Sequence, residues 1–186
     1  MAYFPMFYNL ENRKILVIGG GKIATQKLEK LVQFTKEITV IAKEVSKEVY
    51  DLIKIHCLTL YKRAYRVDDI EGFDIVIVAT DNIAMQESIF KESRGKNILI
   101  NAVDNINYCD FIFPSFIKRG DLTVAFSTSG VSPAFAKQYR KKIEESLPKD
   151  VDIFLQKLKK IRANMPKGKD RMEYLEKLVE DYFREN

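Results

Sequence analysis

A glycine-rich turn set between a strand pattern and a helix pattern constrains this chain most. The turn reads Gly19-Gly20-Gly21-Lys22-Ile23-Ala24 and directly follows a predicted strand at residues 14–18. Gly19 suits a tight bend, Gly21 lets the backbone approach a pyrophosphate, and Ala24 lets the next helix pack on the strand. We therefore predict a βαβ unit that binds a dinucleotide through Gly19, Gly21, Lys22 and Ile23. The alternative is a glycine turn that binds nothing.

The pattern continues beyond this unit, because short β-branched runs alternate with segments of helical period. Strands are predicted at residues 14–18, 38–41, 58–61, 75–79 and 98–101, and helices at residues 23–34, 46–54 and 83–93. Right-handed crossovers between parallel strands place their carboxyl ends at one edge of the sheet. The chain is thus predicted to be an α/β protein with a Rossmann-type parallel sheet, and its ligands are expected at that edge.

The pattern changes after Asp104. Residues 111–117 and 122–126 are predicted as two further strands, and Ser132 and Pro133 begin a helix that extends to about Leu147. Two apolar helical faces separated by a break at residues 166–168 then predict an antiparallel helical hairpin. The predicted division is a nucleotide-binding domain at 1–113, a strand-and-helix segment at 114–147 and a helical domain at 148–186.

Composition excludes several classes of protein. The longest apolar runs are much shorter than the roughly 18 residues that a membrane span needs, and residues 1–10 lack the basic start and cleavage site of a signal peptide, so we expect a cytoplasmic protein. Two cysteines and a single histidine, His56, are too few for a disulfide framework or a zinc cluster, and no metal site is predicted. The net charge of +5 suits anionic ligands, but without a basic block it does not indicate nucleic acid.

The end of the second predicted strand bears on the choice of dinucleotide. An acidic residue is expected there, about 20 residues after the glycine turn, to accept a hydrogen bond from a ribose hydroxyl. The chain has Lys43 and Glu44 at this point. Glu44 favours NAD, whereas Lys43 could attract the 2′-phosphate of NADP, so these residues favour NAD only slightly. The alternative is a solvated charged loop.

Polar residues also follow the fourth and fifth predicted strands. Thr80 and Asp81 follow the fourth strand, and Asn101 and Asp104 lie at the end of the fifth. A carboxylate at this edge can accept a proton or orient a substrate beside a nicotinamide ring. Asp104 is the stronger catalytic candidate, because aspartate is common at helix N-caps and we expect Asp81 to cap the following helix.

These segments resemble the precorrin-2 dehydrogenase family, which also forms the N-terminal module of bacterial siroheme synthase. The resemblance covers roughly the first 150 residues, in the order of the family. Its most selective part is Asn101-x-x-Asp104 followed by a Phe-Pro-Ser motif and a Ser-Gly-x-Ser-Pro motif. The matching stretches are residues 4–7 with Leu10, 15–24 with Lys27, 79–81, 101–104, 113–115 and 127–133.

The resemblance implies NAD-dependent oxidation of precorrin-2, a tetrapyrrole, to sirohydrochlorin on the route to siroheme and, in some organisms, cobalamin. It assigns the principal catalytic role to the aspartate matched by Asp104. It also implies a Rossmann domain, a dimerisation segment and a helical tail, with two chains building the active-site cleft of a homodimer. Some members also insert ferrous iron into sirohydrochlorin, and the same aspartate is thought to assist there.

The substrate carries many carboxylates, which suits a cationic protein. Hydroxyls and free N–H groups before a helix could hold them, and the candidates are Ser127, Thr128, Ser129 and Ser132. This stretch could equally be an ordinary capping turn. Basic side chains that could pair with the carboxylates are Lys22, Arg119, Lys137 and Arg140.

Two other functions stay open. The chain could be bifunctional and also act as a ferrochelatase, although His56 precedes the third strand and is expected to be structural. It could also bind a tetrapyrrole or nucleotide without turnover, because a fold alone does not establish catalysis.

Overall fold

The computed structural model describes residues 3–185, which form two compact units. The first unit ends at Ile112 and the second begins at Phe113. The further division of the second unit at residue 147 stays a prediction.

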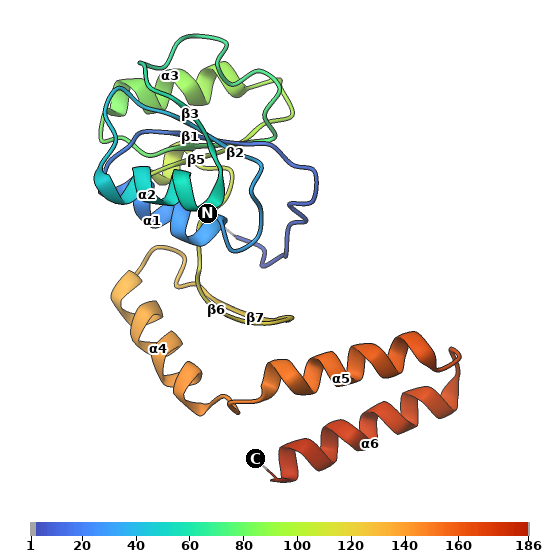
Figure 1. Cartoon of the computed structure of the whole chain (residues 1–186). Coiled ribbons are helices and arrows are strands. Elements are labelled where there is room, and N and C mark those ends of the chain that lie inside the picture. The colour runs from blue at the N-terminus through green and yellow to red at the C-terminus, as the bar shows by residue number, and fades with distance from the viewer. Residues whose placement is uncertain (1–2, 186) are drawn as a thin grey trace. The chain divides into compact units, whose positions relative to one another are not determined.

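The first unit is built on a five-stranded sheet in the order β3-β2-β1-β4-β5, and every neighbouring pair is parallel (Figure 1). The strands are β1 (Ile15–Ile18), β2 (Ile38–Ile41), β3 (Thr59–Tyr61), β4 (Ile75–Val78) and β5 (Leu99–Ala102). All four residues of β1 and of β4 are buried, as expected for strands that are covered on both faces. The predicted α/β fold with a Rossmann-type parallel sheet is confirmed.

Three amphipathic helices cover this sheet. They are α1 (Lys22–Leu31), α2 (Lys47–His56) and α3 (Ile83–Ser93). Figure 1 shows α1 and α2 on one face and α3 on the other. The α1 helix buries Ala24, Leu28 and Leu31, which recur at helical spacing. This spacing is the physical reason why a helix forms here as predicted, although it ends at Leu31 and not at the predicted residue 34.

The second unit begins with an antiparallel hairpin of β6 (Ser115–Arg119) and β7 (Leu122–Phe126). The predicted start of the first of these strands at residue 111 is wrong. A short 3₁₀ helix, η1 (Ile106–Tyr108), follows β5, and Asp110 then donates its backbone N–H to Ile100 O at 2.8 Å. The chain near residue 110 therefore pairs with β5, and the hairpin begins only after Pro114, which has no N–H to donate.

Three helices complete the second unit: α4 (Pro133–Ser146), α5 (Val151–Asn164) and α6 (Lys169–Glu185). Phe154, near the start of α5, stacks on Tyr182, near the end of α6, with ring centroids 3.9 Å apart. The Tyr182 hydroxyl donates to Asp150 at 2.8 Å. These contacts join the start of α5 to the end of α6, so the helices run antiparallel as predicted.

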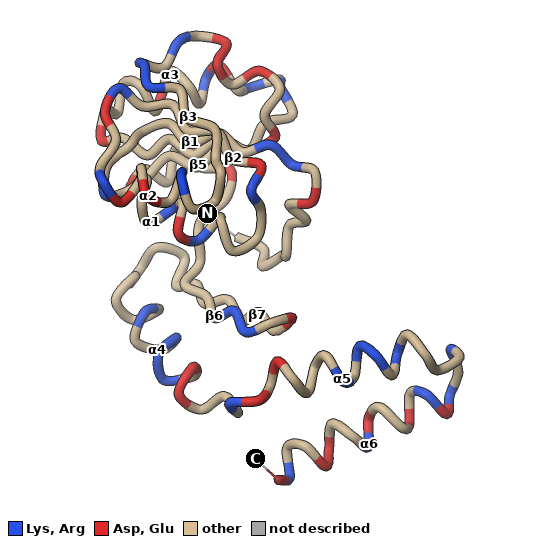
Figure 2. The backbone as a smooth tube through the Cα atoms, in the orientation of Figure 1, with Lys and Arg blue, Asp and Glu red and all other residues tan. Residues whose placement is uncertain are grey.

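Charged residues of both signs are spread over both units, as Figure 2 shows. Among residues 3–185, no helix is long and apolar enough to cross a membrane.

Candidate functional site

The loops that follow the parallel strands of the first unit meet at one edge of the sheet. Backbone pairing continues just beyond the strand ends, since Gly19 N donates to Ile41 O at 2.9 Å and Ala79 N to Ile18 O at 2.8 Å. Val103 N likewise donates to Val78 O at 3.1 Å. The loops after β1, β4 and β5 are therefore held side by side at the edge where open α/β sheets bind ligands.

The glycine turn fits a dinucleotide pyrophosphate. Gly19 has a φ of +120°, and a Cβ there would lie 2.2 Å from Ala79 O, so this position requires glycine. Gly21 caps α1 without a side-chain hydrogen bond, and a Cβ built on it meets nothing within 4 Å. The first N–H groups of a helix lack partners within the helix and carry partial positive charge. The α1 N-terminus, where Lys22 and Ile23 lie, is thus open to an anionic group.

The loop after β2 lies against the same turn. Ser46 N donates to Gly20 O at 2.7 Å, and a Cβ on Gly20 would lie 2.2 Å from Glu44 O. The Ser46 hydroxyl accepts from Val49 N at 3.3 Å and so caps α2. Lys43 and Glu44 are both exposed in this loop. The structure therefore brings both residues beside the glycine turn.

The loop after β4 corrects one expectation. The N-cap of α3 is Asn82, whose side chain accepts from Met85 N at 3.0 Å, so the prediction that Asp81 caps this helix is wrong. Asp81 is exposed, and Thr80 accepts a hydrogen bond from Asn82 N at 3.3 Å. The neighbouring asparagine supplies the cap, which leaves the Asp81 carboxylate at the candidate site.

Asp104 follows β5 in a turn that needs an uncommon backbone conformation. Its φ is +58°, in the left-handed region that aspartate and asparagine tolerate better than most residues. The residue is exposed, whereas its neighbours Ala102 and Val103 are buried. The candidate carboxylate is thus presented to solvent from a turn anchored in the core.

The segment after Asp104 folds back onto β5. The Cys109 thiol donates to Ala102 O at 3.0 Å, and burial raises the pKa of this thiol against the opposing effect of the Lys27 charge. Asn101 is buried, and its side-chain amide donates to Phe111 O at 2.8 Å. Asn101 Oδ1 has no partner among the described residues. The observed contacts of Asn101 therefore hold the returning segment, while its role toward a cofactor stays a proposal.

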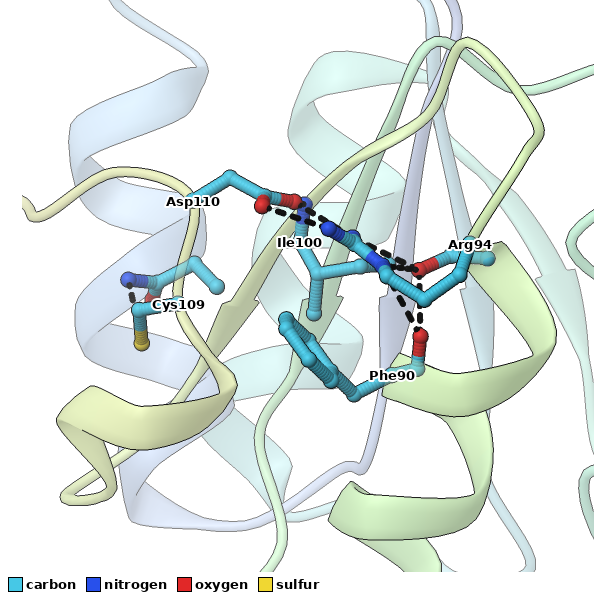
Figure 3. Close-up of polar contacts among 7 residues, drawn as sticks. Phe90, Arg94, Ile100, Cys109 and Asp110 are labelled. Atoms are coloured by element: carbon cyan, nitrogen blue, oxygen red, sulfur yellow. Dashed lines mark hydrogen bonds and ion pairs between the residues drawn. The ribbon is translucent and has the colours of Figure 1, made fainter.

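An ion pair fastens this return (Figure 3). Both terminal guanidinium nitrogens of Arg94 donate hydrogen bonds to the Asp110 carboxylate, at 2.8 and 2.7 Å. The guanidinium carbon also lies over the Phe90 ring, 4.1 Å from the ring centroid. Asp110 also accepts from Ile100 N at 2.8 Å. Burial alone would raise the pKa of Asp110, but the hydrogen bonds from Arg94 and Ile100 together outweigh it, so this pKa lies below its usual value.

We expect Asp110→Asn to lower the free energy of unfolding by about 1 to 2 kcal/mol at neutral pH, because a bidentate charged pair is lost. The lowered pKa means that this contribution is present above pH 3.8, the ordinary carboxyl value, and is lost as the pH falls below it. Denaturant unfolding at neutral pH and at about pH 3 measures both. The matched control is Asp121→Asn, which breaks an ion pair with Lys159 that is more than half exposed on both sides. A loss at about pH 3 as large as the loss at neutral pH would contradict the expectation.

Lys27 is a titratable group on α1 that sequence reasoning did not assign. Burial of its ammonium group and the nearby charge of Lys30 lower its pKa to about 8, against the smaller opposing effects of Cys109 and Asp104. The charge of Asp104 acts on Lys27, so the Lys27 ammonium group lies near the candidate site. The only signal in the sequence was its place in the family stretch, because the helical pattern alone reads a lysine as exposed.

Lys27→Met should raise the free energy of unfolding at neutral pH by about 1 to 3 kcal/mol, since one unit of pKa corresponds to about 1.4 kcal/mol and the side chain keeps some contact with water. A lysine with a lowered pKa destabilises the fold fully below about pH 8, and this cost disappears as the pH rises toward 10.5. The advantage of the variant should therefore fade over that range. Unfolding curves at several pH values check this, with Lys22→Met, an exposed lysine of the same helix, as control.

The predicted substrate loop lies in the second unit, and its hydroxyls form hydrogen bonds within the loop and to the start of α4. The Ser127 hydroxyl accepts from Ser129 N and the Thr128 hydroxyl from Ser132 N, both at 3.0 Å. Ser132 caps α4 through Phe135 N at 3.2 Å, as predicted. These hydroxyls hold the loop in shape, so their hydrogens, rather than these backbone N–H groups, remain to bind a carboxylate.

The candidate cations of the second unit are partly engaged. Arg119 donates to Glu144 O at 3.1 Å, and Arg140 pairs with the Glu144 carboxylate. Lys137 is exposed. In the first unit, His56 ends α2 just before β3, at the edge of the sheet opposite the strand carboxyl ends.

Two family models match the chain. One, described as "Putative NAD(P)-binding", matches residues 6–115, and the other, described as "Sirohaem biosynthesis protein central", matches residues 119–146. The first match includes the glycine turn and Asp104.

Known proteins give the same picture. The chain is 35% identical over 165 residues to a siroheme synthase of Pseudoalteromonas atlantica, covering 89% of this chain and 36% of that protein. It is 32% identical over 184 residues to a siroheme synthase of Methylococcus capsulatus, covering 97% and 39%. The chain thus spans little more than a third of the length of these relatives. Among solved structures it resembles SirC, a precorrin-2 dehydrogenase, with a TM-score of 0.84, 24% identity, and coverage of 98% of this chain and 92% of the other.

Proposed function

Because the chain belongs to the NAD(P)-binding family whose model spans residues 6–115, we propose that it catalyses the NAD-dependent oxidation of precorrin-2 to sirohydrochlorin in siroheme biosynthesis. One observation carries the proposal. The uncapped glycine turn and the Asp104 carboxylate follow β1 and β5 at the same edge of one sheet. A dinucleotide and a reacting carboxylate can therefore share one crevice.

Residues at the carboxyl ends of β1, β2, β4 and β5 would hold the cofactor. Gly19, Gly21, Lys22 and Ile23, at the α1 N-terminus, would bind the pyrophosphate. Glu44 would accept from the ribose hydroxyls, which favours NAD, and Lys43 lies beside it. Thr80, Asp81 and, through the backbone segment that it holds, Asn101 would serve the nicotinamide end.

The reaction removes two electrons and two hydrogens from the tetrapyrrole. NAD, when bound, supplies the acceptor for the hydride. The Asp104 carboxylate takes the proton at one of its oxygens or holds the macrocycle for this transfer. Hydroxyls of Ser127, Thr128, Ser129 and Ser132 and the cationic surface hold the acetate and propionate groups of the substrate.

An anaerobic assay tests the function. Purified chain, given precorrin-2 and either NAD or NADP, should form NADH together with sirohydrochlorin and should prefer NAD. Binding of both ligands without NADH formation would contradict the proposal and favour a carrier protein. A rate of iron insertion into sirohydrochlorin above the spontaneous rate would add the ferrochelatase activity.

We also propose a cytoplasmic homodimer assembled through the second unit. Support comes from large apolar side chains of this unit that are exposed in the single chain, among them Val131 at 87% and Phe135 at 62%. Exposed large apolar side chains are typical of protein interfaces when they gather on one face. Sedimentation equilibrium of the unmodified protein should give twice the mass of one chain. The Phe135→Glu variant should give the mass of a single chain.

A further inference from the structure

The α3 helix carries a buried amide that the proposed chemistry does not use. Gln86 is 2% exposed and lies on the face of α3 that also buries Ile89 and Ser93. Buried glutamines are uncommon, because a polar group removed from water costs free energy unless it is paired. The burial of Gln86 therefore requires a structural explanation.

Its partners lie at the two strand ends that flank the candidate site. Gln86 Nε2 donates to Thr80 O at 2.7 Å and to Val103 O at 3.0 Å. Thr80 follows β4 and Val103 follows β5, each beyond the last residue of its strand. One amide thus continues the pairing of the sheet where backbone pairing between these strands ends.

The second of these carbonyls belongs to the residue just before Asp104. A peptide plane is rigid, so holding Val103 O fixes the orientation of the peptide that joins Val103 to Asp104. Asp104 has a φ of +58°, and its direction depends on that peptide. On the other side of Asp104, Tyr108 N donates to Asn105 O at 3.1 Å. The catalytic turn is thus fastened both before and after Asp104.

The acceptor end of the same amide is unsatisfied. Gln86 Oε1 is buried and has no hydrogen-bond partner within residues 3–185. An apolar side chain would avoid this cost but would leave the two carbonyls without their donor. The presence of a glutamine at this buried position is therefore explained by the N–H groups of its amide, which bind the two carbonyls beside the catalytic turn.

We propose that Gln86 is a positioning residue, whose amide holds the loops after β4 and β5 together and so sets the direction of the Asp104 side chain. The inference rests on the proposed function, in which Asp104 meets the substrate. Gln86 itself touches neither the cofactor nor the substrate.

The test uses two variants of the full chain. Gln86→Glu keeps the shape of the side chain but, when ionised, has no N–H to donate. Gln86→Asn keeps the amide on a shorter arm and serves if the first variant does not fold. The matched control is Ile89→Val, which removes one methylene group from the same buried face without touching either carbonyl. Thermal unfolding establishes that each variant is folded.

Two measurements follow. Hydrogen exchange of the amides at residues 80–82 and 103–106 should be faster in the Gln86 variants than in the control. The kcat for precorrin-2 oxidation should fall roughly 10- to 100-fold, on the scale known for small misplacements of reacting groups. In an Asp104→Asn background the same substitutions should change kcat little, because they act through Asp104.

Unchanged exchange in a folded Gln86 variant, or full kcat despite faster exchange, would overturn the inference. An equal loss of kcat in both backgrounds would also overturn it, because the effect would then not pass through Asp104. Absence of turnover by the unmodified chain would instead contradict the proposed function, and the exchange measurement would still decide whether the amide holds the turn.

Discussion

Asp104→Asn is expected to lower kcat for precorrin-2 oxidation roughly 10²- to 10⁴-fold, the range known for loss of a general acid or base. The substitution removes the charge and the proton-accepting oxygen while keeping the size of the side chain. Asparagine tolerates the left-handed conformation as well as aspartate does, so the φ of +58° should not destabilise the variant. Stopped-flow detection of NADH and a thermal melt measure the two quantities.

The chain offers a matched control for this change. Asp68 is also an exposed aspartate in the left-handed region, with a φ of +70°, and it lies between β3 and β4, before the amino end of β4. Asp68→Asn makes the same chemical change at a distance from the proposed site and should leave turnover unaltered. A fully active Asp104→Asn variant would remove Asp104 from the mechanism, whatever the control does.

The second large effect concerns the two outer glycines of the turn, Gly19 and Gly21, which we expect to have different roles. Gly21→Ala should fold normally, because its Cβ would meet nothing within 4 Å, yet it should weaken NAD binding at least roughly tenfold, since the methyl group occupies the path of the pyrophosphate. A tenfold change corresponds to about 1.4 kcal/mol. Titration calorimetry with NAD measures the affinity, and thermal unfolding shows whether the fold is kept.

Gly19→Ala should act through the fold itself. Its Cβ would lie 2.2 Å from Ala79 O, and its φ of +120° is strained for alanine, so we expect a loss of about 3 to 5 kcal/mol in the free energy of unfolding. Denaturant unfolding measures this loss.

For the Gly21→Ala prediction, an NAD affinity equal to that of the unmodified chain would place the pyrophosphate elsewhere.

The elements of the first unit could be predicted from sequence because their apolar periodicity is strong. The predicted strand at 38–41 and the predicted helix at 83–93 match β2 and α3 residue for residue. The start of β6 could not be predicted in this way, since residues 111–114 have strand-like composition while the pairing of Asp110 with β5 is a tertiary contact. Local pattern does not report a bridge between distant segments.

The site could be predicted only as a set of loops. Strand ends and the glycine turn placed Gly19, Gly21 and Asp104 on one edge of the sheet, as the topology requires. The side chains that organise this edge escaped prediction because their partners are backbone carbonyls in other loops. Gln86 is the main example, and its only signal was a polar residue at helical spacing from the apolar Ile89. The capping of α3 by Asn82 rather than Asp81 escaped prediction for a different reason, because both residue types favour that position.

A crystal structure of the full chain with NAD bound tests the central claim most directly. The claim predicts that the pyrophosphate lies on the N-terminus of α1 and that the nicotinamide ring and the Asp104 carboxylate face one cavity, close enough to contact a single macrocycle. A nicotinamide ring on the opposite side of the sheet from Asp104, or a dinucleotide bound away from the glycine turn, would contradict it.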